Sequence, residues 1–243
     1  VDASRPTICK TRILAHDSSI VQQQVVRMDR LSRQPVDDSI FCQLSDYLEK
    51  TTDQVDAILI SDYKSGVVSP RMAQLCHDLT DSRGKLLTVD SQGDLHQFKG
   101  FGLVKCNQAE AEASLGHPLE NDEQFEAACR QLLDDLGACV VVITRGGNGM
   151  SMMQNGGKHI HISVANRSEV FDVTGAGDTS IAVLTLAMAA GARPVTAAHL
   201  ANYAAGLVVR KIGNATTTVE ELREAITSSQ FPRVDPEMDL TPQ

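Results

Sequence analysis

Residues 102–144 decide the fold class, and they read GLVKCNQAEAEASLGHPLENDEQFEAACRQLLDDLGACVVVIT. An apolar strand over 102–106 opens this stretch, and the β-branched run 139–144 closes it as a strand too apolar to be exposed on one face. Two helices are predicted between them, 108–115 and 122–136, and each ends before a glycine that can close it. Strands that alternate with helices favour a layered α/β/α fold with a mostly parallel central sheet.

The same alternation continues on both sides of this stretch. Residues 8–15 and 20–29 alternate apolar and polar side chains, which predicts a hairpin. The further strands are predicted at 57–60, 86–90, 150–154 and 158–164. The further helices are predicted at 37–51, from the Ser69-Pro70 start to about 84, and at about 176–190, 194–210 and 218–228.

Polar residues follow four of the predicted strands: Asp62, Asp90, Asn107 and Arg145. Ligands of parallel α/β sheets bind beyond the carboxyl ends of the strands, where these residues lie. The sequence therefore predicts that these four side chains gather at one rim of the sheet.

Composition and charge exclude several classes of protein. The chain has 243 residues, a formal net charge of −9 and only nine Phe and Tyr residues, which argues against a nucleic-acid partner. Its longest uncharged apolar stretch lies between Asp178 and Arg193 and is shorter than the ~18 residues of a membrane helix. The six cysteines show no C-x-x-C pair and mostly lie in apolar runs. We therefore expect a cytoplasmic protein with free thiols and no membrane or nucleic-acid partner.

The front of the chain differs in charge from the remainder. Residues 1–35 carry six basic and three acidic side chains, a net charge of +3 on an otherwise acidic protein. This local charge favours a small anion bound near the hairpin. The alternative is a solvated hairpin with ordinary surface charge.

Segment 171–179, FDVTGAGDT, is the motif most indicative of chemistry, and it leads directly into an apolar helix. Gly175, Ala176 and Gly177 would let backbone N–H groups converge on an anion at the positive end of the helix dipole. Asp178 beside this anion hole suits a base that accepts a proton from a hydroxyl attacking phosphorus. The alternative is that Asp178 caps the helix and the glycines only form a turn. Neither a dinucleotide fingerprint nor a Walker motif is present.

Segment 171–183 resembles the second signature of the ribokinase-like carbohydrate kinases, also called the PfkB family. Four shorter segments follow in that family's order: SDYKSG at 61–66, VD at 89–90, NQAE at 107–110 and VITRGG at 142–147. The front of the chain, including QQVVRMD at 23–29, is most similar to the heptose-7-phosphate kinase branch. The resemblance extends to about residue 228.

The resemblance implies a role for each matching residue. Asp178 would be the catalytic base, and Gly175, Ala176 and Gly177 would form the anion hole. Asn107 and Glu110 match the Asn-x-x-Glu motif that holds hydrated Mg²⁺ near the phosphates of ATP. For these two residues the alternative is a helix cap with a solvent-facing charge.

Other residues would border the nucleotide or the sugar. Thr144 and Gly146 match the strand end beside the nucleotide, and Asn202 falls where a helix borders adenine. Their alternatives are an ordinary strand exit and a polar residue on a helix surface. The hairpin corresponds to the family's lid, which makes Lys10 and Arg12 candidates for binding a sugar phosphate.

The resemblance also implies how the chain is divided into segments, and it shows which residues differ from the family's pattern. It implies a lid segment at 1–35, a kinase core at 36–228 that is incomplete at its N-terminus, and a loose tail at 229–243. The family's early strands have no match before the lid, and the chain starts at Val1 without Met, so we expect a processed or truncated start. The residues that depart from the family's pattern are Ser65, Gln92, Lys105, Cys106 and Val183.

We therefore expect ATP-dependent phosphorylation of a sugar phosphate, namely heptose 7-phosphate to the 1,7-bisphosphate. The alternatives are another PfkB sugar kinase of the fructose or ribose type, and a non-catalytic nucleotide-binding fragment. A monovalent cation such as K⁺ near Asp172 and a homodimer formed through the lid are left open.

Overall fold

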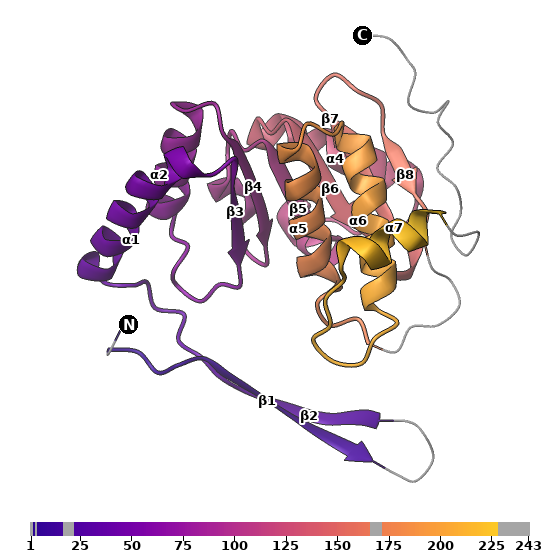
Figure 1. Ribbon diagram of the computed structural model, residues 1–243, viewed down its shortest axis with the longest axis horizontal. Helices are drawn as coiled ribbons and strands as arrows, with labels where there is room; N and C mark the ends of the chain where they lie inside the picture. Colours follow the sequence, from indigo (N-terminus) through magenta and orange to yellow (C-terminus); the bar gives the residue numbers. More distant parts are fainter. Residues whose placement is uncertain (1, 3, 17–21, 166–171, 228–243) are drawn as a thin grey trace.

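A six-stranded sheet with the order β3-β4-β5-β6-β7-β8 forms the middle layer of the molecule (Figure 1). The computed structural model describes residues 2, 4–16, 22–165 and 172–227. The sheet strands are β3 (Ala57–Asp62), β4 (Leu86–Ser91), β5 (Leu103–Asn107), β6 (Val140–Thr144), β7 (Met150–Gln154) and β8 (Ile160–Ile162). Strands β3 to β6 are parallel, whereas β7 and β8 are antiparallel to their neighbours. This confirms the predicted mostly parallel sheet.

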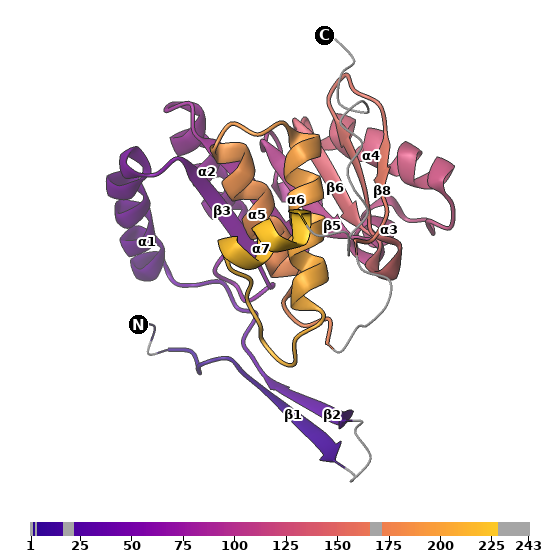
Figure 2. The same cartoon turned by 45° about the vertical axis from the view of Figure 1, so that its right-hand side comes forward.

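Helices cover both faces of this sheet. The helices are α1 (Asp38–Thr51), α2 (Pro70–Asp81), α3 (Gln108–Leu115), α4 (Asp122–Leu136), α5 (Ala176–Ala189), α6 (Pro194–Val208) and α7 (Val219–Thr227). Helices α2, α3 and α4 pack on one face, with α1 against α2, whereas α5 and α6 pack on the other (Figure 2). The predicted α/β/α layering is therefore confirmed.

The alternation of side chains along β6 separates two hydrophobic cores. Val141 and Ile143 point into the core with α2 and α4, while Val140 and Val142 point into the core with α5 and α6. All four are buried because both faces of an inner parallel strand are covered. This explains why the run is continuously β-branched.

Local signals set the ends of the helices where the sequence predicts them. Ser69 caps α2 by accepting a hydrogen bond from the backbone N–H of Met72, and Pro70 occupies the first turn. Gly116 and Gly137 end α3 and α4 with φ angles of 79° and 58°, in the left-handed region. Predicted and observed helix bounds therefore agree to within a few residues.

Strands β1 (Cys9–His16) and β2 (Gln22–Arg30) form an antiparallel hairpin that projects away from the layered core (Figure 1). The predicted hairpin is confirmed, although its turn at 17–19 lies outside the described residues. The predicted tail at 229–243 also lies outside them. Each helix in the described part of the chain is too short or too polar to span a lipid bilayer.

Candidate active site

A cavity of about 560 Å³ lies at the carboxyl ends of β3 to β6. Asp62, Asp90, Asn107 and Arg145 all line it, which confirms the predicted rim. The parallel strands bring their carboxyl ends to the same edge, so residues from distant parts of the sequence meet there. Other predicted site residues on its wall are Glu110, Thr144, Gly146, Gly177 and Asp178.

The start of α5 brings the predicted base, Asp178, and one residue of the predicted anion hole, Gly177, to this cavity, whereas Gly175 and Ala176 do not line it. Gly175 precedes the helix with a φ of 83°, a left-handed conformation that favours glycine. Ala176 and Gly177 form the first helical turn, where the helix dipole is positive. The Asp178 carboxylate accepts a hydrogen bond from the Tyr63 hydroxyl. The N-cap is Gly175, without a side-chain hydrogen bond, so the alternative that Asp178 caps the helix is wrong.

Lys105 places a buried positive charge beside this helix start. Its ammonium donates a 2.7 Å hydrogen bond to Asp90, and the Lys105 side chain is 3% exposed. A Cβ placed on Gly177 would lie 3.5 Å from Lys105 Nζ, so the ammonium lies next to the predicted anion hole. Burial raises the pKa of Asp90, although the charge of Lys105 opposes that rise. In the sequence, Lys105 stands out only as a departure from the family's pattern. A single lysine within an apolar strand is the feature from which a role in the site could have been predicted.

Asn107 and Glu110 form a capping box at the start of α3. The Asn107 side chain accepts from the Glu110 backbone N–H at 2.9 Å, and the Glu110 carboxylate accepts from the Asn107 N–H at 2.7 Å. Burial is the main cause that raises the pKa of Glu110. The helix cap of the alternative is therefore confirmed, but not its solvent-facing charge, because Glu110 is half-buried and lines the cavity with Asn107.

The oxygens of this pair fit Mg²⁺ as ligands. An amide and a carboxylate are the hard oxygen donors that Mg²⁺ takes, and protein-bound Mg²⁺ usually keeps several waters and binds substrate phosphates. Within the described residues, no three His, Cys, Asp or Glu side chains gather around one metal position. Mg²⁺ would therefore need ligands from water and phosphate as well as from Asn107 and Glu110.

The residues predicted to border the nucleotide do not all face the cavity. Thr144 and Gly146 lie on its wall, at the end of β6. Asn202 is buried in α6 and donates a 2.7 Å hydrogen bond to the Ser163 carbonyl. Its side-chain amide thus holds the segment after β8, and its role beside adenine stays a prediction.

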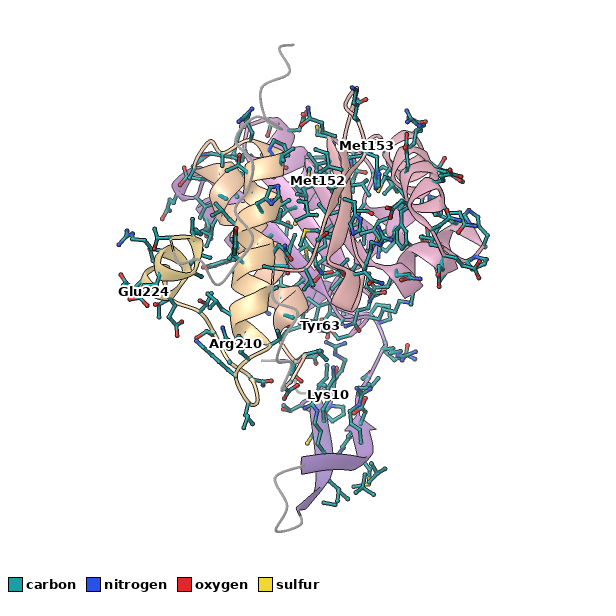
Figure 3. All side chains as sticks on the ribbon, turned by 90° about the vertical axis from the view of Figure 1, so that its right-hand side faces the viewer. Lys10, Tyr63, Met152, Met153, Arg210 and Glu224 are labelled. Atoms are coloured by element: carbon teal, nitrogen blue, oxygen red, sulfur yellow. The ribbon has the colours of Figure 1, made fainter. Side chains whose placement is uncertain are left out.

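The predicted sugar-phosphate ligands lie on the hairpin. Lys10 Nζ lies 5.3 Å from the centre of the Tyr63 ring, and Figure 3 shows the two side chains where the hairpin meets the core. Arg12 is exposed and lies close enough to Asp172 to help lower the pKa of that carboxyl. Hydrogen bonds from Thr174 are the larger cause of this lowering. The Lys10 and Arg12 roles stay predictions.

Asp62 and Tyr63 extend the site beyond the residues singled out for roles in catalysis. Asp62 is buried, and its carboxylate accepts hydrogen bonds from Ser91 Oγ and from the Lys64 backbone N–H, both at 2.9 Å. Tyr63 follows directly and reaches Asp178 across 115 positions of sequence. Their place in the SDYKSG segment is the signal that could have identified them.

A protein family and several curated proteins are similar to this chain in sequence. Residues 30–221 match the pfkB family of carbohydrate kinases. Among curated proteins, the chain is 39% identical over 227 residues to the bifunctional protein HldE of Paramagnetospirillum magneticum. It is also 39% identical over 222 residues to the HldE of Geobacter sulfurreducens. These alignments cover 93% and 91% of this chain but only 45% and 44% of the relatives, so the chain spans about half their length.

Solved structures share the fold at low sequence identity. Ribokinase from Arabidopsis thaliana, solved with ribose and ATP, aligns with a TM-score of 0.73 at 19% identity over 93% of this chain and 71% of that one. Phosphofructokinase-2 from Escherichia coli, solved with potassium, aligns with a TM-score of 0.71 at 20% identity over 88% of this chain and 69% of that one. The family match, the HldE relatives and the ribokinase-like fold lead to one conclusion: this chain belongs to the pfkB family of carbohydrate kinases.

Proposed function

We propose that this chain transfers the γ-phosphoryl group of ATP to a hydroxyl of heptose 7-phosphate, giving the 1,7-bisphosphate, with Asp178 as the general base. One observation carries this proposal. The carboxylate of Asp178, the helix start at Gly177 and the Asn107–Glu110 pair line a single cavity. A base, an anion hole and oxygen ligands for Mg²⁺ are the groups that phosphoryl transfer requires.

The transfer follows from the positions of these groups. Asp178 accepts the proton of the acceptor hydroxyl as that oxygen bonds to the γ-phosphorus, and the bond from phosphorus to the ADP oxygen breaks. Backbone N–H groups at the start of α5 and the Lys105 ammonium stabilise the charge on the transferred group. Asn107 and Glu110 would hold Mg²⁺, which neutralises phosphate charge when it is bound.

The hairpin supports a sugar-phosphate acceptor. Lys10 and Arg12 are adjacent on one face of β1, opposite Asp29 and Arg27 of β2. Two cations on the side of the hairpin that reaches Tyr63 suit the phosphate that the acceptor sugar already carries. We propose that the hairpin closes as a lid over the sugar and excludes water during transfer.

Three further properties belong to this proposal. The exposed apolar residues of the hairpin support a homodimer formed through the lid. A monovalent cation near Asp172 is supported by the potassium named in the phosphofructokinase-2 structure. The six cysteines all have free thiols, which supports a location in the reducing cytoplasm.

ADP release over a panel of sugars and sugar phosphates tests the function. We expect turnover with heptose 7-phosphate and a loss of about 100-fold or more in kcat for Asp178→Asn, because the amide cannot accept the proton. The assay uses this chain and an N-terminally extended form, with circular dichroism to show that the variant is folded. Turnover that Asp178→Asn leaves unchanged would rule out the base.

The panel also separates the alternatives. A preference for fructose or ribose phosphates would assign another sugar kinase of the same family. Binding of ATP without turnover on any acceptor, in both forms of the chain, would favour a non-catalytic nucleotide-binding role.

A further inference from the structure

Tyr63 lies in a turn whose shape is fixed from within the core. The turn follows β3, and the buried Asp62 carboxylate holds it through the Ser91 hydroxyl and the Lys64 backbone N–H. Lys64 has a φ of 54°, in the left-handed region that residues other than glycine rarely adopt. These hydrogen bonds hold the backbone on either side of Tyr63, although Tyr63 itself is 43% exposed.

The Tyr63 hydroxyl is a donor to the proposed base. It donates to Oδ1 of Asp178, and burial together with this hydrogen bond raises the pKa of Tyr63. The phenol therefore stays protonated at neutral pH and can donate but cannot act as a base. Tyr63 engages Oδ1, so under the proposed function Oδ2 would be the oxygen that accepts the proton of the acceptor hydroxyl.

The same turn is tied to the base of the hairpin. The Arg5 guanidinium donates to the carbonyls of Ser65, at 2.9 Å, and of Gln34, at 2.7 Å. The Val36 backbone N–H donates to the Gly66 carbonyl at 2.9 Å. Lys10 of the hairpin also lies over the Tyr63 ring (Figure 3). The turn that carries Tyr63 is therefore bonded to the two segments that flank the hairpin, and Tyr63 itself contacts the hairpin through Lys10.

We infer that Tyr63 is a positioning residue, which holds one oxygen of Asp178 so that the other faces the acceptor hydroxyl and which links the hairpin to the base. This inference rests on the proposed function. A tyrosine that only packs against the cavity wall would make neither the bond to Asp178 nor the contact with Lys10. Through these two contacts, Tyr63 connects Lys10 of the hairpin with Asp178 of α5.

Tyr63→Phe tests the role because it removes only the hydroxyl and keeps the ring under Lys10. We expect kcat to fall about tenfold, the rate equivalent of one hydrogen bond to a charged group, with KM for ATP and the thermal midpoint unchanged. Tyr47→Phe, on the exposed surface of α1, is the matched control and should match the wild type.

A double-mutant cycle shows whether Tyr63 acts through Asp178. In an Asp178→Asn background, measured by single turnover, Tyr63→Phe should have almost no further effect. Additive losses would overturn the inference, because they would mean that Tyr63 acts independently of the base. A Tyr63→Phe variant with the kcat of the wild type would overturn it as well.

A titration that needs no turnover separates this inference from the proposed function. The chain has only three tyrosines, so the absorbance of ionised Tyr63 can be identified by difference from Tyr63→Phe. In Asp178→Asn the Tyr63 phenol should ionise at lower pH than in the wild type, because the carboxylate charge that raises its pKa is gone. If Tyr63 ionises at the same pH in Asp178→Asn as in the wild type, the contact between Tyr63 and Asp178 is refuted. If no acceptor supports turnover, the proposed function fails and this titration alone decides the contact.

Discussion

Lys105 and Asp90 form an ion pair with little exposure to solvent in the cavity wall. The pair adds little to the free energy of unfolding, yet it places charged groups where a ligand would bind. The two side chains are 3% and 16% exposed, so both charges have lost most of their water. Desolvation makes such a pair a weak source of stability, but loss of one partner leaves an uncompensated charge. Both charges lie beside Gly177, since a Cβ placed there would be 3.5 Å from Lys105 Nζ and 3.9 Å from Asp90 Oδ2. Under the proposed function, the ammonium is the group of this pair that would face a phosphate.

We expect Lys105→Met to lower the free energy of unfolding by about 3–5 kcal/mol, because Asp90 then stays buried without its partner. Urea denaturation at neutral pH measures this change. The double variant Asp90→Asn with Lys105→Met should recover most of the loss, since no buried charge remains. The matched control is Arg130→Met in the exposed pair with Glu126, where about 1 kcal/mol or less is expected. Equal losses for the buried and the exposed pair would contradict this account.

At the scale of elements, α3 and α4 begin with the same capping device in different surroundings. Asn107 and Glu110 cap α3 on the cavity wall, whereas Asn121 and Gln124 cap α4 with the same pair of reciprocal hydrogen bonds. A capping box stabilises a helix wherever it lies. Comparison of the two helices therefore separates the structural role of Asn107 from a role in binding.

Asn107→Ala and Asn121→Ala should each cost about 1 kcal/mol of unfolding free energy, because each removes one side-chain cap. Only Asn107→Ala should raise KM for Mg-ATP, by about tenfold or more, if that amide also contacts hydrated Mg²⁺. Thermal unfolding and initial rates at varied Mg²⁺ measure the two effects. Equal changes in KM for both variants would mean that Asn107 caps α3 and has no separate role in binding Mg-ATP.

Most of the elements could be predicted from sequence because their signals are local. Ser69, Pro70, Gly116 and Gly137 act on backbone groups within four residues, so the bounds of α2, α3 and α4 follow from the sequence itself. Strand β8 is shorter than the predicted 158–164, because pairing with β7 extends only over Ile160–Ile162. Its length depends on a partner strand, which a local pattern does not describe.

At the scale of the whole molecule, the hairpin has two faces of different character. Lys10 and Arg12 lie on one face of β1, whereas Ile13 pairs with Val26 and Thr11 with Met28 on the other. Ile13, Val26 and Met28 are 43% to 55% exposed, although such side chains are normally buried. An apolar face on a projecting hairpin suits a second copy of the chain.

We expect the wild type to sediment as a dimer, at about twice the 26.2 kDa of the chain, and Ile13→Lys with Met28→Lys to sediment as a monomer. The two lysines place like charges on the face that the partner would cover. Val219→Lys, on an exposed position of α7, is the control and should leave the dimer intact. Analytical ultracentrifugation over a range of concentrations measures the mass, and a monomeric wild type would contradict the proposed dimer.

The sequence by itself determined the alternation of strands and helices, the glycine-rich start of α5 and the rim of Asp62, Asp90, Asn107 and Arg145. Each of these depends on short-range periodicity, on caps or on the rule that parallel strands end at the same edge. Only the tertiary structure decided which of these residues touch. Tyr63 reaches Asp178 and Lys105 reaches Asp90 because strand order and helix packing bring them together. Such contacts depend on distances through space, and no local pattern in the chain encodes them.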